Sequence, residues 1–467
     1  LGANARRAIY NLEQHLSPFL GRLEEEGKLE EVHLWNIAPR LRGEFAVVGG
    51  LAGERQERLA DLGCFFSLQL LHLNLYSLDL LRFQVHTRRE KMGAYRDFIV
   101  RAGTGFEELV GAYMEELTDL FFGREKRPLF AFIAVGTPYH QGDIELGVVD
   151  DGTPARGNLH RVLTRLEPEM LRRAPAVHFC ASENVGEENY CASLAEYREL
   201  LDHRLQDFNL IRAMLCCRLL AGSRGLYQDF RAHIIGRYFF DPDRSCRHHE
   251  AFLRGILGEI RARRLRSYAD SEIHLYEDGL LLGRCLAAAL RSVYGVEDPP
   301  MPALFAGLRS ADPKMAGLFT ELEEILVFLE TFRLLNHLLL GGDDSVALYS
   351  PTDVERLRPI ALAMGYRDAG PVKAHQKVLT HWQERVEKAR ELTDRLLPFL
   401  TSHLSRLKTG ITMLALPGEE EEGENLALDL AEVLAFQRGA RYWDDLLLSL
   451  EEENSPLLRK FVKDLGR

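Results

Sequence analysis

Two acidic side chains, Asp143 and Glu145, have the clearest potential for chemistry in this sequence. They open the segment Asp-Ile-Glu-Leu-Gly-Val-Val at residues 143–149, which predicts a β-strand. Because successive side chains of a strand point to opposite faces, both carboxylates are expected on one face. Carboxylate oxygens are the ligands that Mg²⁺ prefers, so this pair could share a divalent cation.

A small α/β unit is expected to position these acids. An apolar run at residues 129–135 predicts a buried strand, which ends in a tight turn at Gly136. The expected order is helix, strand, turn, strand, helix and strand, over residues 105–122, 129–135, 136–142, 143–149, 159–170 and 176–181. We therefore predict one α/β domain at residues 105–187.

Helices are expected on both sides of this domain. Residues 1–104 predict a helical domain, with one long buried helix at residues 64–90, although residues 44–48 could form a strand. Residues 188–416 predict a helical bundle without a convincing strand. Residues 417–467 predict an acidic linker followed by C-terminal helices. The predicted fold is thus mainly α, with a small α/β domain followed by a helical bundle.

The charge balance argues against a general nucleic-acid-binding protein. The 467 residues include 58 Lys and Arg against 70 Asp and Glu, which leaves a net charge of −12. An acidic chain repels the phosphate backbone, so we do not expect it to bind nucleic acid. The basic run Arg-Ala-Arg-Arg-Leu-Arg at residues 261–266 is interpreted as a solvated helix face, with a phosphate or an acidic partner as the alternative.

Apolar and cysteine patterns favour a cytoplasmic protein. Polar residues interrupt the most apolar segment, residues 64–81, so a buried helix is favoured over a membrane span. The seven cysteines include no Cys-x-x-Cys pair, which indicates neither a disulfide framework nor a zinc site. The adjacent Cys216 and Cys217 are predicted to pack inside an apolar helix.

Four segments of the helical region carry a resemblance to a known family. They are Phe332-Arg-Leu-Leu-Asn-His-Leu-Leu-Leu340, Gly341-Gly-Asp-Asp344, Tyr349-Ser-Pro-Thr-Asp353 and Leu362-Ala-Met-Gly-Tyr-Arg-Asp368. In this order they resemble the helical segment of bacterial glutamine synthetase adenylyltransferases and PII uridylyltransferases, which belong to the nucleotidyltransferase superfamily. The similarity covers roughly residues 105–400 and is discontinuous.

The resemblance implies a function for the acidic strand and the turn before it. Enzymes of this family transfer a nucleotide from ATP or UTP to a protein hydroxyl, with Mg²⁺ held by carboxylates. By resemblance, Asp143 and Glu145 are the catalytic and metal-binding acids. Gly136 and Thr137 form the nucleotide-binding turn, where glycine lets the backbone approach phosphate. The implied acceptor is a protein partner, in the manner of glutamine synthetase or PII.

Three features of the chain depart from the family pattern. Only residues 138–142 separate Thr137 from Asp143, which makes this loop shorter than in the family. His178 stands where a third carboxylate is expected. The acidic pair expected after Gly279 is replaced, in this chain, by Leu281, Leu282 and Arg284.

Three functional interpretations therefore stay open. The first is a metal-dependent nucleotidyltransferase with an incomplete active-site motif, acting in signalling. The second is a catalytically inactive regulatory or scaffolding protein of the same fold. The third is a purely helical interaction protein, in which the predicted strands do not exist.

Overall fold

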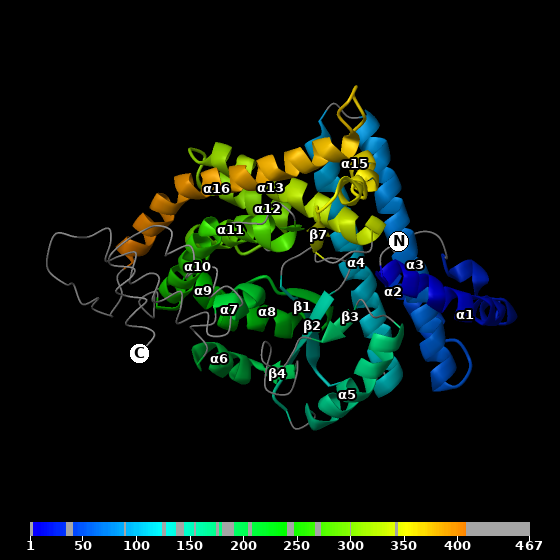
Figure 1. The fold of residues 1–467 in the computed structure, drawn as a ribbon. Coiled ribbons are helices and arrows are strands. Elements are labelled where there is room, and N and C mark those ends of the chain that lie inside the picture. The colour runs from blue at the N-terminus through cyan, green and yellow to red at the C-terminus, as the bar shows by residue number, and fades with distance from the viewer. Residues whose placement is uncertain are drawn as a thin grey trace, which may run out of the picture.

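The computed structural model describes most of the chain up to Leu407. The described residues are 3–33, 41–87, 90–123, 128–136, 144–153, 156–173, 177–179, 191–203, 208–240, 247–266, 272–298, 300–340 and 344–407. They form a mainly helical fold with a small sheet region, which confirms the mainly α prediction (Figure 1). The predicted C-terminal helices at residues 417–467 lie outside the described residues.

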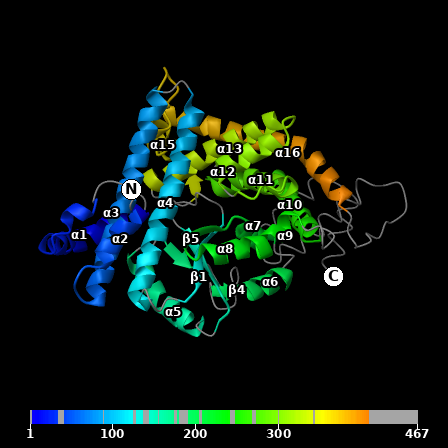
Figure 2. The ribbon, with the colours of Figure 1, turned by 180° about the vertical axis from the view of Figure 1, so that it is seen from behind.

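Helices form the N-terminal part of the fold. They are α1 (Ala3–Glu25), the short η1 (Leu29–Glu31), α2 (Leu41–Gly49), α3 (Arg55–Thr87) and α4 (Lys91–Phe122). Helices α3 and α4 lie side by side along one side of the molecule in both views (Figures 1 and 2). They reach from α5 (Arg156–Arg173) to α15 (Arg358–Ala363), so they connect the sheet region to the far end of the bundle.

The strand considered for residues 44–48 is wrong, because these residues belong to helix α2. Leu41, Phe45 and Val48 are spaced by four and three residues and are all buried. This spacing places them on one helix face, which packs against α3 and α4. A run of only five residues does not distinguish a buried helix turn from a strand.

Helix α4 crosses the predicted boundary between residues 104 and 105. Its first half contributes Tyr95 and Phe98 to the core of the bundle. Its second half contributes Phe106 and Tyr113 to the core of the N-terminal helices. Both cores therefore share this one helix.

Five of the described strands form a mixed sheet. They are β1 (Phe130–Val135), β2 (Ile144–Asp150), β3 (Val177–Phe179), β4 (Cys191–Ser193) and β5 (Arg218–Gly222). The order is β3-β2-β1-β5. Strand β3 pairs with residues 144–146 of β2, and β4 pairs with residues 148–150. Strand β1 is antiparallel to β2 and β5, whereas β3 and β4 are parallel to β2. Helix α5 makes the crossover from β2 to β3, so the predicted order of elements is confirmed.

Both faces of the sheet are covered, each by a different core. Phe132 and Val148 pack with the N-terminal helices and α5. Ile133 and Val149, on the opposite face, pack with the helices of the bundle. Because alternate residues of β1 face different cores, all six of its residues are buried.

The bundle contains strands that were not expected. Strand β5 lies beside β1, between α4 and α8 (Arg224–Phe230) (Figure 2), and the short β6 (Glu272–His274) pairs with β7 (Ser345–Ala347). Cys216 and Cys217 occupy the turn before β5, so their placement inside a helix is wrong. Cys217 is nevertheless buried in the core, as expected of a packing cysteine.

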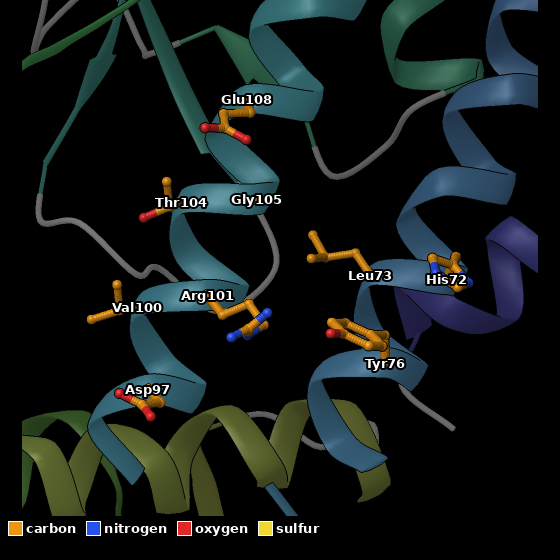
Figure 3. A pocket seen from close by; sticks show the side chains of 9 residues that line it. All are labelled: His72, Leu73, Tyr76, Asp97, Val100, Arg101, Thr104, Gly105 and Glu108. Atoms are coloured by element: carbon orange, nitrogen blue, oxygen red, sulfur yellow. The ribbon is translucent and has the colours of Figure 1, made fainter. Parts of the chain in front are cut away.

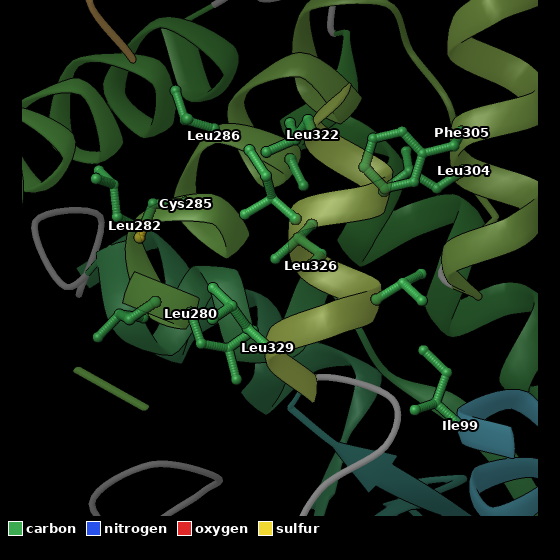
Figure 4. Close-up of a cluster of buried hydrophobic side chains, with 14 of the residues drawn as sticks. Ile99, Leu280, Leu282, Cys285, Leu286, Leu304, Phe305, Leu322, Leu326 and Leu329 are labelled. Carbon is green, nitrogen blue, oxygen red and sulfur yellow. The ribbon is translucent and has the colours of Figure 1, made fainter. Parts of the chain in front are cut away.

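The remaining elements of the bundle are helical. They are α6 (Leu194–His203), α7 (Phe208–Leu215), η3 (Arg231–Ile235), α9 (Gly236–Phe239), α10 (Arg247–Leu265), η5 (Tyr276–Leu280), α11 (Leu281–Val293), α12 (Met301–Ala311), α13 (Ala316–Leu335), η6 (Asn336–Leu340), α14 (Pro351–Glu355) and α16 (Ala374–Arg406). Side chains of α11, α12 and α13 interlock in the core, and Figure 4 shows part of this packing. Trp382 and Val386 lie on the buried face of α16.

Helix α3 has the composition of a membrane span. Among the described residues it alone is long and apolar enough to cross a bilayer, but 56% of its most apolar window is buried within the fold. Packing against α1, α2 and α4 accounts for this apolar character.

Candidate functional site

The strand register brings two of the predicted site residues to one end of the sheet. Gly136 directly follows β1, and Glu145 pairs with Val135, the last residue of that strand. Only the backbone of Glu145 is described. Thr137 and Asp143 lie outside the described residues, so their predicted roles stay predictions.

His178 occupies a register position next to this end of the sheet. In the parallel pairing of β2 with β3, the partner of Glu145 is His178. The position where a third carboxylate was expected by resemblance is therefore next to Glu145 in the register.

Another acid of β2, Asp150, lies at the opposite end of the strand. Asp150 ends β2 and pairs with Phe130, the first residue of β1. It lies five positions after Glu145, which corresponds to roughly 17 Å along a strand. Its carboxylate accepts a hydrogen bond from the Gly152 amide at 2.8 Å and one from the Cys191 thiol at 3.3 Å. Asp150 therefore stabilises the end of β2 and does not reach the Gly136 turn.

Gly136 has a backbone conformation that favours glycine. Its φ of +86° lies in the left-handed region, where a Cβ is strained. Its N–H donates to the Ala213 carbonyl at 3.1 Å, and its carbonyl accepts from Arg218 Nη1 at 2.9 Å. Apart from its chain neighbours, no described atom lies within 4 Å of the position that a Cβ would take.

Arg218 is a residue of this region that the sequence did not reveal. It starts β5 and is 9% exposed. Besides Gly136, its guanidinium binds the Glu107 carboxylate on α4 and the Cys216 carbonyl. Glu107 and Gly136 are 111 and 82 residues away in the chain, so no local pattern indicates these contacts.

The segment that replaces the expected acidic pair is part of the bundle core. Leu281 and Leu282 are buried, and so is Arg284, which pairs with the Glu330 carboxylate of α13. The Arg284 guanidinium also lies 5.2 Å from the centre of the Tyr276 ring. These side chains pack within the bundle core.

A second charged cluster lies next to this pair. Arg333 donates two hydrogen bonds to Asp344, at 2.6 and 2.7 Å, and His337 lies 3.0 Å from the same carboxylate. Burial opposes ionisation of Asp344, but the His337 and Arg333 contacts outweigh it and hold the pKa well below its usual range. Asp344 therefore anchors the start of β7 to α13 as a carboxylate.

A cavity of about 570 Å³ lies between α3 and α4. Arg101 of α4 and Tyr76 of α3 face each other across it (Figure 3), with the guanidinium 5.5 Å from the ring centre. Gly105 lines the same cavity in the interior of α4, where its lack of a side chain leaves space for Leu73. Neither Gly136 nor Glu145, the predicted site residues within the described ranges, lines this cavity.

The basic run at residues 261–266 is half-buried at the end of α10. Three of its arginines pair with acids of the fold: Arg263 with Glu259 of the same helix, Arg264 with Asp394 of α16, and Arg266 with Glu277 of η5. The face expected to be solvated is thus only partly exposed, and two of its arginines contact neighbouring helices.

Across the described ranges, no group of three or more His, Cys, Asp and Glu side chains could hold a metal ion. Asp143 lies outside these ranges.

Two histidines make stability depend on pH. His249 is buried, its Nδ1 lies 3.1 Å from the Tyr238 carbonyl oxygen and from Ser292 Oγ, and its ring is 5.8 Å from that of His403. Burial lowers the pKa of both rings, and Arg406 lowers that of His403 further. The unfolded chain therefore binds protons more readily than the folded one. We expect the free energy of unfolding to decrease as the pH falls below about 6.5.

This pH dependence is measured by urea unfolding between about pH 5 and 7.5. The change in the free energy of unfolding per pH unit should be smaller for His249→Gln/His403→Gln, because the two titrating rings are removed. An unchanged slope in this variant would show that other groups are responsible.

No protein-family model matches the chain, and no curated protein matches its sequence.

Proposed function

We propose that α4, β1, β2, α5 and β3 form a nucleotidyltransferase-like domain that binds ATP or UTP together with Mg²⁺. In this proposal Asp143 and Glu145 hold the metal, and Gly136 and Thr137 start the nucleotide-binding turn. The acceptor is the hydroxyl of a partner protein, as in the cytoplasmic enzymes that the sequence resembles. Bound Mg²⁺ would neutralise phosphate charge and activate the attacking oxygen.

The strand topology near Gly136 is the observation that carries this proposal. An antiparallel hairpin followed by a helix and a parallel strand brings three positions together: the Gly136 turn, Glu145 and His178. The lack of a side chain at Gly136 and its positive φ support close approach of a phosphate group to the backbone. His178 would supply an imidazole where the family has a carboxylate.

The burial of Leu282 and Arg284 favours a second candidate function. These side chains replace the expected acidic pair and belong to the bundle core. The second candidate is therefore a catalytically inactive protein of the same fold, which binds a regulatory partner and transfers no nucleotide.

Thermal unfolding with and without nucleotide tests the proposed site. At a nucleotide concentration 100 times the Kd, binding stabilises the folded state by about 2.7 kcal/mol. We expect a higher Tm with ATP or UTP in the presence of Mg²⁺, and no increase after chelation by EDTA. The increase should be lost in Asp143→Asn/Glu145→Gln, because this variant lacks both metal-binding carboxylates.

A variant with the same change in charge is the control. Asp151→Asn/Glu13→Gln removes two exposed acids, and Asp151 lies just beyond the opposite end of β2. It should keep the Mg²⁺-dependent increase in Tm. An equal loss of the Mg²⁺-dependent increase in Tm in both double variants would mean that net charge, and not a metal site, determines binding.

A further inference from the structure

Arg218 joins three elements at the end of the sheet where Gly136 lies. Its Nε and Nη2 contact one Glu107 carboxylate oxygen, at 2.7 and 2.6 Å. Its Nη1 donates to the Gly136 carbonyl at 2.9 Å and to the Cys216 carbonyl at 2.6 Å. One side chain therefore connects α4, the end of β1 and the turn before β5.

Gly136 is held through both of its backbone polar groups. Its N–H donates to Ala213 at the end of α7, and its carbonyl accepts from Arg218. Strand pairing alone does not fix this residue, because the register of β1 with β5 ends at Ala134 and Arg218. The orientation of the peptide groups at Gly136 thus depends on contacts outside the ladder.

We propose that Arg218 is a positioning residue that fixes the Gly136 turn for binding of the nucleotide phosphates. This inference rests on the proposed function of the turn. Arg218 acts through Gly136: its Nη1 is occupied by two carbonyls, and Glu107 balances its charge. Its planar fork matches several acceptors at fixed angles, which the single ammonium of lysine does not reproduce.

Arg42 provides a matched control in the same part of the fold. It also joins α4 to β5, because its guanidinium contacts Glu115 at 2.6 Å and the Leu220 carbonyl at 3.0 Å. In contrast to Arg218, it makes no contact with Gly136 in the described structure. Arg42 is also more exposed than Arg218, so folding of each variant is checked by its Tm.

The experiment compares wild type, Arg218→Met, Arg218→Lys and Arg42→Met in two measurements. The first is hydrogen exchange, with mass spectrometry of peptides covering residues 129–136 and 213–219. The second is the Kd for Mg²⁺–ATP and Mg²⁺–UTP, at a temperature where every variant is folded. We expect faster exchange in both peptides and at least tenfold weaker binding for Arg218→Met. Arg218→Lys should be intermediate, and Arg42→Met should match the wild type in both measurements.

The outcomes separate this inference from the proposed function. If the wild type binds nucleotide and Arg218→Met binds equally well, the positioning role is wrong while the proposed function stands. If Arg42→Met changes exchange and affinity as much as Arg218→Met does, the cause is general loosening of β5 and the inference is also wrong. If the wild type binds neither nucleotide, the proposed function fails and the phosphate role of Arg218 fails with it. The exchange data then decide whether Arg218 fixes the turn.

Discussion

Glu330→Ala is expected to lower the free energy of unfolding by about 3–5 kcal/mol, because it leaves a buried guanidinium without its counter-charge. Glu330 is 2% exposed and its partner Arg284 is 7% exposed. Tyr276 lies against the guanidinium but contributes no negative charge. The measurement is equilibrium unfolding in urea, compared with the wild type.

Two further variants identify the cause of this loss. Arg284→Leu/Glu330→Leu removes both charges, so it should be much less destabilising than Glu330→Ala alone. Asp394→Ala breaks the exposed pair with Arg264, whose side chains are 40% and 50% exposed, and should cost less than about 1 kcal/mol. A loss below about 1 kcal/mol for Glu330→Ala would contradict the unpaired-charge explanation.

Gly111→Ala is expected to destabilise the protein by about 1–3 kcal/mol, because helix α4 packs directly on the backbone of β5. A Cβ at Gly111 would lie 2.5 Å from the Leu220 carbonyl oxygen. Neither backbone can move aside without disturbing the pairing of β5 with β1. This cost outweighs the gain of about 1 kcal/mol that alanine normally gives in a helix interior.

Gly21→Ala is the matched control, because Gly21 also lies inside a helix but no described atom is within 4 Å of its added Cβ. It should stabilise the protein by up to about 1 kcal/mol. Thermal and urea unfolding of both variants give the comparison. Stabilisation by Gly111→Ala would contradict the close packing of α4 on β5.

The sequence predicted those elements whose signals are local. The apolar run before Gly136 and the acidic segment after it became β1 and β2. Leu159, Leu163 and Leu166, at helical spacing, became the buried face of α5. These patterns are complete within a few residues, so each element could be predicted without its neighbours.

Elements defined by distant contacts were missed. The five residues of β5 show no alternation of polar and apolar side chains, because they pack between β1 and α4, and neighbouring helices led us to expect a helix. The role of Arg218 depends on Glu107 and Gly136, which are far away in the chain. At the candidate site, the sequence predicted the turn at Gly136 and the strand of Glu145, whereas Asp143 and Thr137 lie outside the described residues.

The central claim is that the end of the sheet at Gly136 binds a nucleotide through Mg²⁺. Calorimetric titration of ATP and UTP into the protein, with Mg²⁺ and then with EDTA, measures this directly. Our account predicts binding of at least one of the two nucleotides near one per chain, abolished by EDTA and by Asp143→Asn/Glu145→Gln. No binding of either nucleotide at millimolar concentration with Mg²⁺ would contradict it.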